Sequence, residues 1–182
     1  MDIKHILEYQ RQEEMLVKAA ILAYVAAELA KSNYRGFYVG CSVLAYNGYY
    51  YQIFTGINQM DERGGIKICA EQQAIGNARE AGYLQIIAIT VVGNCQRDGT
   101  SGHYSITLHP CGGCRRYCSA FSGVSSETIV LTVRIDNPKI REEHTFQQIV
   151  LLHNVKTWKE IFSSRISSVY SQFKLLISRY SY

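Results

Sequence analysis

The chain is predicted to fold as a three-layer α/β domain. Three observations predict this class: a long helical segment comes first, a β-hairpin follows it, and strand-like and helix-like segments then alternate. Alternating helices and strands build a sheet with helices on its faces, and the later strands are expected to be joined by right-handed crossovers. With 182 residues, of which 47% are hydrophobic, the chain has material for one sizeable core.

The first part of the chain is expected to supply a helix and a hairpin. Apolar residues recur at helical spacing from Ile6 to Lys31, among good helix formers. Val39 to Tyr46 has the length and composition of a strand. Asn47-Gly48 is a strong hairpin signal, so Tyr49 to Gly56 is expected to return as the second strand. Residues 57–67 are predicted to form a loop.

The second part alternates helices and strands. Ala70 to Ala81 is helical by composition and ends at Gly82, which suits the position after a helix. Ile86 to Val92 is an almost unbroken apolar run, which is typical of a strand covered on both faces. The elements expected after it are a polar loop over Gly93 to His109, a helix after Pro110, a strand over Thr128 to Arg134 and a fifth strand over Gln148 to His153.

The positive charge of the chain is concentrated near its end. The net charge is +4, and the segment 156–182 alone supplies it, with basic residues Lys156, Lys159, Arg165, Lys174 and Arg179 against Glu160. Apolar residues recur there at helical spacing, which predicts a basic amphipathic helix docked on the domain or on a neighbouring subunit. The expected organisation is one domain over 1–155 followed by this helix.

The start of the chain does not resemble an export signal. Met1-Asp2-Ile3-Lys4-His5 carries an acidic residue where a signal peptide would be basic. The apolar stretch from Met15 to Ala30 contains Lys18 and Glu28, which favours a core helix over a membrane span. We therefore expect a soluble protein of the cytoplasm, where closely spaced cysteines bind metal more often than they form disulfides.

Two short segments contain the residues with the clearest chemistry. Cys69-Ala70-Glu71 stands where one predicted helix begins, and Pro110-Cys111-Gly112-Gly113-Cys114 begins another. Cys111 and Cys114 have the Cys-x-x-Cys spacing that lets both sulfurs face one metal, and a helix N-terminus stabilises thiolates. Three thiolates can hold one zinc ion per chain and leave its fourth position to water, as in catalytic zinc sites.

Glu71 is the expected proton carrier of this site. It lies two residues beyond Cys69, too close in sequence to coordinate the same ion easily. Beside the open position it could take a proton from zinc-bound water and pass it to a substrate nitrogen. A glutamate in a helix or a Cys-x-x-Cys pair is common by itself, but their combination favours a catalytic zinc site.

These motifs resemble the signature of the zinc-dependent cytidine deaminases, in the all-cysteine form of the small homotetrameric enzymes. The resemblance extends over residues 32–135. The segment Ser32 to Gly40 is similar to the family's entry into its first strand, and Ile53 to Asn58 is similar to the strand end that meets the ribose. It implies an α/β/α cytidine-deaminase-like catalytic domain with a mixed five-stranded sheet.

The activity implied by the resemblance is hydrolytic deamination of cytidine or deoxycytidine to the uracil nucleoside, with release of ammonia. Hydroxide would attack C4 of the base while Glu71 transfers protons, and zinc would be held by Cys69, Cys111 and Cys114. The resemblance also implies a cytosine nucleoside as ligand, a role in pyrimidine salvage and a homotetramer or dimer. Neither a membrane nor nucleic acid is an expected partner.

The resemblance assigns the substrate contacts to three further residues. Phe37 would stack near the pyrimidine ring, Asn58 would bind a ribose hydroxyl, and the backbone of Ala70 would contact the base. Met60 departs from the pattern, because the nucleoside enzymes usually carry a glutamate at that position. Blasticidin S deaminase, a relative, also lacks this glutamate, so a modified cytosine nucleoside such as blasticidin S remains an alternative substrate.

Further features of the sequence keep rival functions open. Gln72 stands where an arginine commonly offsets the thiolate charge, and the loop 93–109 is longer than usual. The basic tail leaves editing of a base in single-stranded nucleic acid as a rival. A rival from another class is an inactive zinc-held scaffold that binds a partner through its C-terminal helix, although the intact Glu71 argues against it.

The remaining cysteines and one histidine have secondary roles in this interpretation. Cys118 could face the metal, but a fourth thiolate would close the site. Cys41 and Cys95 are expected to behave as small core residues. His109, just before Pro110, is a candidate hydrogen-bond donor behind the metal ligands.

Overall fold

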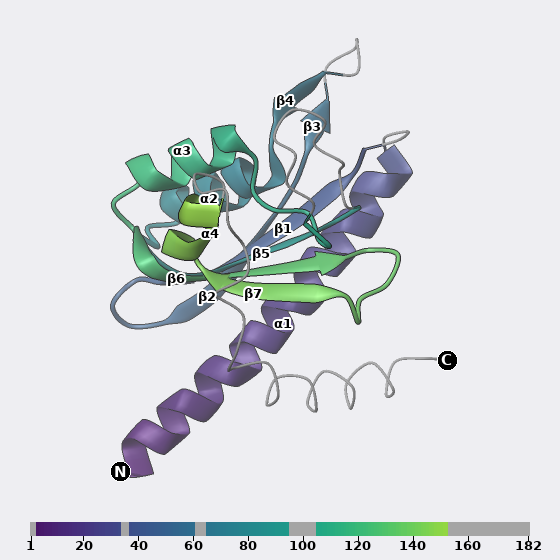
Figure 1. Ribbon diagram of the computed structural model, residues 1–182. Coiled ribbons are helices and arrows are strands. Elements are labelled where there is room, and N and C mark those ends of the chain that lie inside the picture. The colour runs from purple at the N-terminus through teal and green to yellow at the C-terminus, as the bar shows by residue number, and fades with distance from the viewer. Residues whose placement is uncertain (1–2, 34–36, 61–64, 95–104, 153–182) are drawn as a thin grey trace.

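The computed structural model describes residues 3–33, 37–60, 65–94 and 105–152, in which a five-stranded sheet carries helices on both faces (Figure 1). The strand order is β2-β1-β5-β6-β7. Strands β5 and β6 run parallel, and the other neighbouring pairs are antiparallel. The predicted three-layer α/β/α class with a mixed five-stranded sheet is confirmed.

Helix α1 (Ile3–Asn33) packs closely on one face of the sheet, against β1 (Val39–Tyr46). A row of buried alanines lets the two backbones approach: Ala19, Ala20, Ala23, Ala26, Ala27 and Ala30. Ser42 donates a hydrogen bond of 2.6 Å to the carbonyl of Ala19, and a Cβ atom at Gly40 would lie 2.2 Å from the backbone nitrogen of Ala27. The first predicted helix and strand are both present.

Strand β2 (Tyr51–Ile57) completes the predicted hairpin with a longer turn than expected. The side-chain oxygen of Asn47 accepts hydrogen bonds from the backbone N–H groups of Tyr49 and Tyr50. Gly48 adopts a φ of 97°, a conformation that glycine tolerates without strain. Because this Asx-type turn uses Tyr49 and Tyr50, the second strand begins two residues later than the sequence predicts.

The segment predicted as a loop over residues 57–67 contains two short strands. Strands β3 (Gln59–Met60) and β4 (Ile66–Ile68) pair antiparallel in a small sheet of their own, which projects beyond the main sheet in Figure 1. The loop expectation was wrong here, because strands of two and three residues are too short to show a periodicity.

Helix α2 (Ala70–Glu80) covers the other face of β1 and is fastened to β2. The backbone N–H of Ile57 donates to the side-chain oxygen of Gln73 at 2.7 Å, and the amide of Asn77 donates to the carbonyl of Thr55 at 3.0 Å. The helix ends before Gly82, whose φ is 80°, as the sequence predicts. These contacts fix the position of the helix N-terminus.

The next elements are a buried strand, a helix and a long strand: β5 (Gln85–Gly93), α3 (Gly112–Ala120) and β6 (Val124–Arg134). All three were predicted, although β6 begins four residues earlier than expected. The expected loop 93–109 is described only at its two ends, because 95–104 lie outside the described residues.

The end of the described chain differs from the prediction. Residues 148–152, expected to belong to a strand, lie in helix α4 (Phe146–Leu152), and the fifth strand is β7 (Arg141–Thr145). Thr145 and Gln148 bond reciprocally, side chain to backbone, as a capping box that starts the helix. The strand prediction was wrong because a short apolar run does not distinguish a buried strand from a buried helix.

Two apolar clusters hold the layers together. The larger one lies between the sheet and helices α2, α3 and α4, and a smaller one lies between the sheet and α1. None of the helices within the described residues is both long and apolar enough to cross a membrane. The predicted basic helix over 156–182 lies outside the described residues and stays a prediction, as does the division at residue 155.

Gly56→Ala is expected to destabilise the protein by about 3 kcal/mol, because overpacking against backbone atoms cannot relax cheaply. A Cβ atom at Gly56 would lie 2.4 Å from the carbonyl oxygen of Ala70 and 2.6 Å from the nitrogen of Ala74, in the first turns of α2. The matched control is Gly76→Ala, because a Cβ atom there would have nothing within 4 Å. This substitution is expected to stabilise the helix by about 1 kcal/mol. Urea denaturation measures both. Equal stabilities of Gly56→Ala and wild type would contradict the close contact.

Candidate metal centre

The N-termini of helices α2 and α3 converge and bring three cysteine sulfurs together. Cys69 immediately precedes α2, Cys111 immediately precedes α3, and Cys114 lies in the first turn of α3. The sulfurs of Cys69 and Cys111 are 3.8 Å apart, and all three lie within 4.8 Å of one another. The structure thus joins the two segments that the sequence singled out, which are separated by about forty residues of chain.

The caps of the two helices fix the cysteine backbones. The side-chain oxygen of Gln72 accepts the N–H of Cys69 at 3.3 Å, and the sulfur of Cys111 accepts the N–H of Cys114 at 3.4 Å. Gln72 therefore acts as a helix cap at the position where the resemblance leads one to expect an arginine. Arg115 donates to the carbonyl of Pro110 at 2.6 Å, which keeps a positive charge next to Cys111.

The three sulfurs shift one another's pKa. Hydrogen bonds from the thiols of Cys114 and Cys69 lower the pKa of Cys111 to about 2. The hydrogen bond to Cys111 raises the pKa of Cys69 to about 12 and is also the main cause of the raised pKa of Cys114. Two thiols thus stabilise one thiolate, and a bound divalent cation would favour the thiolate form of all three.

The spacing of the sulfurs fits a zinc ion. Two thiolates bound to zinc at about 2.3 Å with a tetrahedral angle lie roughly 3.8 Å apart. The distance between Cys69 and Cys111 is also 3.8 Å. Cys118 is buried in the apolar core and does not belong to this group, and Cys41 is a fully buried core residue as expected. Cys95 lies outside the described residues.

Glu71 lies buried beside the cysteines. Its side chain belongs to the first turn of α2, and the residue is only 5% exposed. Burial, with a smaller contribution from the charge of Cys111, raises the pKa of Glu71 to about 7. The charge of Glu71 in turn contributes to the raised pKa values of Cys69 and Cys114, so the carboxyl and the sulfurs share one site.

Of the residues expected to contact substrate, Asn58 holds the chain entering β1. Its side-chain oxygen accepts the N–H of Val39 at 2.7 Å, and its amide nitrogen donates to the carbonyl of Phe37 at 3.1 Å. Phe37 is partly buried against the core, and Ala70 is fully buried at the start of α2. A contact of these three residues with a substrate stays a prediction.

Met60 lies in the small two-stranded sheet rather than in the main one. It pairs with Ile66 of β4 and is partly exposed. Residues 61–64, which follow it, lie outside the described residues. The side chain at position 60 is thus carried by a hairpin that leads directly into Cys69 and α2.

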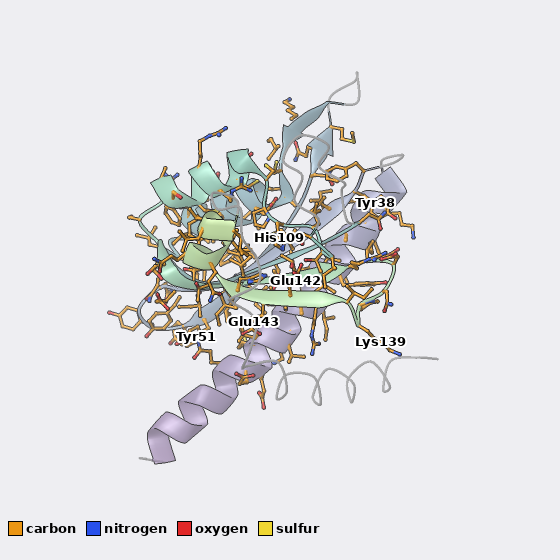
Figure 2. All side chains as sticks on the ribbon, in the orientation of Figure 1. Tyr38, Tyr51, His109, Lys139, Glu142 and Glu143 are labelled. Carbon is orange, nitrogen blue, oxygen red and sulfur yellow. The ribbon has the colours of Figure 1, made fainter. Side chains whose placement is uncertain are left out.

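A second buried cluster joins His109 to Glu142 and His144 of β7, and Figure 2 shows His109 and Glu142 close together. The Nε2 atom of His109 is 3.1 Å from Oε2 of Glu142, and hydroxyls of Ser105 and Thr107 donate to the same oxygen. Of these three residues, the sequence indicated only His109 as a candidate. The position of His109 just before Pro110 and Cys111 gave a weak signal, but nothing in the sequence indicated that Glu142 and His144 would lie beside it.

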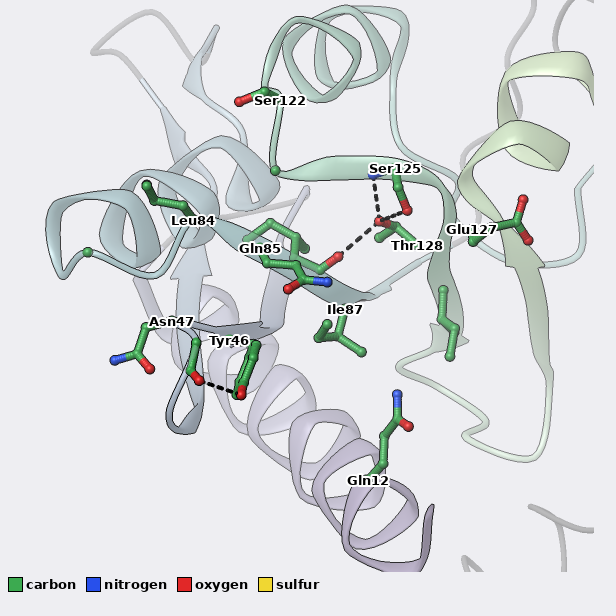
Figure 3. A pocket seen from close by; sticks show the side chains of 15 residues that line it. Gln12, Tyr46, Asn47, Leu84, Gln85, Ile87, Ser122, Ser125, Glu127 and Thr128 are labelled. Carbon is green, nitrogen blue, oxygen red and sulfur yellow. Dashed lines mark hydrogen bonds between the residues drawn. The ribbon is translucent and has the colours of Figure 1, made fainter. Parts of the chain in front are cut away.

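An open groove of about 660 Å³ lies at the end of the main sheet that is opposite to the cysteines (Figure 3). It is bounded by the β1–β2 turn and the first residues of β5 and β6, including Tyr46, Leu84, Gln85 and Ser125. Of the three cysteines, Cys69 instead follows β4 in the chain, and Cys111 and Cys114 come after the end of β5. None of the described residues that line the groove is a cysteine or histidine. The candidate metal ligands therefore lie at the cysteine site and not in this groove.

Comparison with known proteins gives the same family as the motifs. Residues 11–131 match the model of the cytidine and deoxycytidylate deaminase zinc-binding region. A probable cytidine deaminase from Dictyostelium discoideum is 30% identical over 58% of this chain and 64% of its own length. A cytidine deaminase from Halalkalibacterium halodurans is 32% identical over 57% of this chain and 67% of its own length.

Solved structures agree with these relatives. A cytidine deaminase from Burkholderia pseudomallei superposes with a TM-score of 0.55 at 25% identity, covering 72% of this chain and 93% of that one. The enzyme from Mycobacterium tuberculosis gives a TM-score of 0.51 at 25% identity, covering 72% and 90%. The chain belongs to the cytidine and deoxycytidylate deaminase family, and its cofactor is zinc. The matched region spans just under two thirds of the Dictyostelium relative.

Cys114→Ser is expected to remove the thiolate signal of the metal centre, because two sulfurs no longer hold the ion tightly. The measurement is the sulfur-to-cobalt charge-transfer absorbance after the protein is loaded with Co²⁺. The matched control is Cys118→Ser, one turn further along α3 in the apolar core, which should keep the absorbance. Loss of the band in the Cys118 variant, with retention in the Cys114 variant, would place the ligands elsewhere.

Proposed function

We propose that this protein deaminates a cytosine nucleoside, cytidine or deoxycytidine, by hydrolysis to the uracil nucleoside and ammonia. The observation that carries the proposal is a buried carboxyl, Glu71, in the first turn of the helix that Cys69 caps, beside a cluster of three sulfurs whose spacing fits zinc. Membership of the deaminase family and the names of the relatives support the same reaction.

The proposed zinc ligands are Cys69, Cys111 and Cys114. When bound, zinc acts as a Lewis acid that makes water a nucleophile near neutral pH. Three protein ligands leave one coordination position for that chemistry. The N–H of Cys114 donates to the sulfur of Cys111, and the dipoles of both helices offset part of the thiolate charge.

Glu71 has the position of a general acid and base. It is held by the first turn of α2, it is not one of the three sulfur donors, and burial keeps bulk water from competing for its proton. In the proposed reaction it takes one proton from the attacking water and gives it to the ring nitrogen, then takes the remaining proton of the hydroxyl added at C4 and gives it to the amine, which leaves as ammonia. An inactive scaffold would have no use for a buried carboxyl at this place.

The proposed substrate contacts lie around the same helix N-terminus. Asn58 and Phe37 are joined by a hydrogen bond, and the backbone of Ala70 adjoins both Cys69 and Glu71. Met60 offers no carboxylate to a ribose hydroxyl. That one observation favours, as a second candidate, a modified cytosine nucleoside such as blasticidin S.

We also propose that the protein works in the cytoplasm in pyrimidine salvage, as a tetramer or dimer. A self-association surface is supported by an apolar stripe on α1. Leu22, Val25 and Leu29 follow one another at helical spacing and are 40%, 48% and 58% exposed. Three apolar side chains on one helix face are typical of a surface that is covered in an assembly.

Glu71→Gln is expected to lower kcat for cytidine by about 100- to 10,000-fold, because the amide occupies the same space without carrying the proton. Ammonia release measures the activity. The cobalt charge-transfer absorbance should be unchanged, which separates loss of proton transfer from loss of metal. Glu80→Gln, at the far end of α2, is the matched control and should keep full activity. Normal turnover by Glu71→Gln would refute the assigned role.

The two candidate substrates are separated by a panel containing cytidine, deoxycytidine and blasticidin S. We expect wild type to deaminate the first two, and Met60→Glu to change kcat/KM for them by less than about 10-fold. A new hydrogen bond to a charged group, at roughly 1.5–3 kcal/mol, would instead change it by more than about 10-fold. A larger gain on cytidine, with wild type acting only on blasticidin S, would favour the modified nucleoside. Ile66→Val, opposite Met60, controls for disturbance of the hairpin.

A further inference from the structure

The cluster of His109, Glu142 and His144 has the composition of a metal site. Two imidazoles and one carboxylate are brought together by β7 and by the segment that precedes α3. Their ligand atoms lie within 4.8 Å of one another, as do the sulfurs of the cysteine site. The side chains are 3%, 10% and 3% exposed, so all three are shielded from competing water.

The distances within the cluster are close to those around one ion. Two ligands at about 2.1 Å from a metal lie roughly 3.0 Å apart at a right angle and about 3.4 Å apart at a tetrahedral angle. Nε2 of His109 and Oε2 of Glu142 are 3.1 Å apart. Nε2 of His144 lies 4.0 Å from Oε1 of Glu142, and a rotation of either side chain that moves it by less than about 1 Å closes that gap.

Hydroxyl groups complete the polar surroundings. The Ser105 hydroxyl is 2.8 Å from Nε2 of His109 and 2.7 Å from Oε2 of Glu142. The Thr107 hydroxyl contacts the same carboxylate oxygen and the hydroxyl of Thr132. These oxygens can serve as further ligands or can orient the carboxylate toward an ion.

We propose that His109, Glu142 and His144 bind a second divalent transition-metal ion, in addition to the zinc at the cysteines. Imidazole nitrogens select ions such as zinc over calcium or magnesium, which prefer all-oxygen sites. Because the three side chains are buried, the ion has a structural role. It ties the edge strand β7 to the segment just before Pro110 and Cys111, and this role does not depend on the proposed reaction.

The test is the zinc content of the intact chain. Metal-free protein is loaded with Zn²⁺, dialysed against metal-free buffer, and analysed for zinc by mass spectrometry. We expect about two ions per chain in wild type and about one in Glu142→Gln and in His144→Gln. Glu143→Gln is the matched control, because this exposed neighbour on the same strand is not part of the cluster and its loss should leave about two ions.

A titration with Co²⁺ distinguishes the two sites. The first equivalent of Co²⁺ should produce the sulfur-to-cobalt absorbance. The second equivalent should also be bound, but it should not increase this absorbance. Cys111→Ser should lose the absorbance and still retain one ion. His144→Gln leaves the hydroxyl contacts of Glu142 in place. This variant therefore still tests the second metal site if Glu142→Gln fails to fold.

A purely hydrogen-bonded cluster gives a different result. In that case wild type binds one zinc per chain, and Glu142→Gln lowers the melting temperature without changing the metal content. Either observation overturns the second metal site, as does a wild-type zinc content retained by both cluster variants. None of these outcomes depends on whether the protein deaminates cytidine.

Discussion

The close contact between β2 and the first turns of α2 is the constraint on which the candidate site depends. Gly56 has no room for a Cβ atom against Ala70 and Ala74, and the side chains of Gln73 and Asn77 bond to the backbone of β2. The helix therefore cannot shift along the sheet without losing both packing and hydrogen bonds. Because Cys69 and Glu71 stand at the start of this helix, their position is inherited from the sheet rather than from a flexible loop.

The sequence predicted most of the fold because its signals are local and strong. The long helix, the hairpin and the apolar strand β5 each have their own periodicity or turn residues. It failed where a local signal was weak or ambiguous. Arg141 to Thr145 is too charged to resemble a strand, and the capping box of Thr145 and Gln148 was hidden by the apolar run that follows it.

The cysteine site could be predicted because its residues form two compact motifs. The cluster around Glu142 could not, since His109 and Glu142 are 33 residues apart and are joined only when β7 pairs with β6. Strand pairing decides which face Glu142 occupies, and a register shift of one residue would replace it with Glu143. A polar cluster on an edge strand is therefore a property of tertiary structure and leaves no motif in the sequence.

The small β3–β4 sheet shares no strand with the main sheet, although it leads directly into Cys69. Gln59 and Met60 are only partly buried and can therefore change with little effect on the core, whereas a change at Ala70 or Ala74 disturbs fully buried atoms. The hairpin that carries Met60 and the proposed reaction centre thus differ in their tolerance to mutation. If the proposed function holds, such a division would let the preference for one nucleoside over another drift during evolution, while the proposed chemistry at the metal is inherited unchanged.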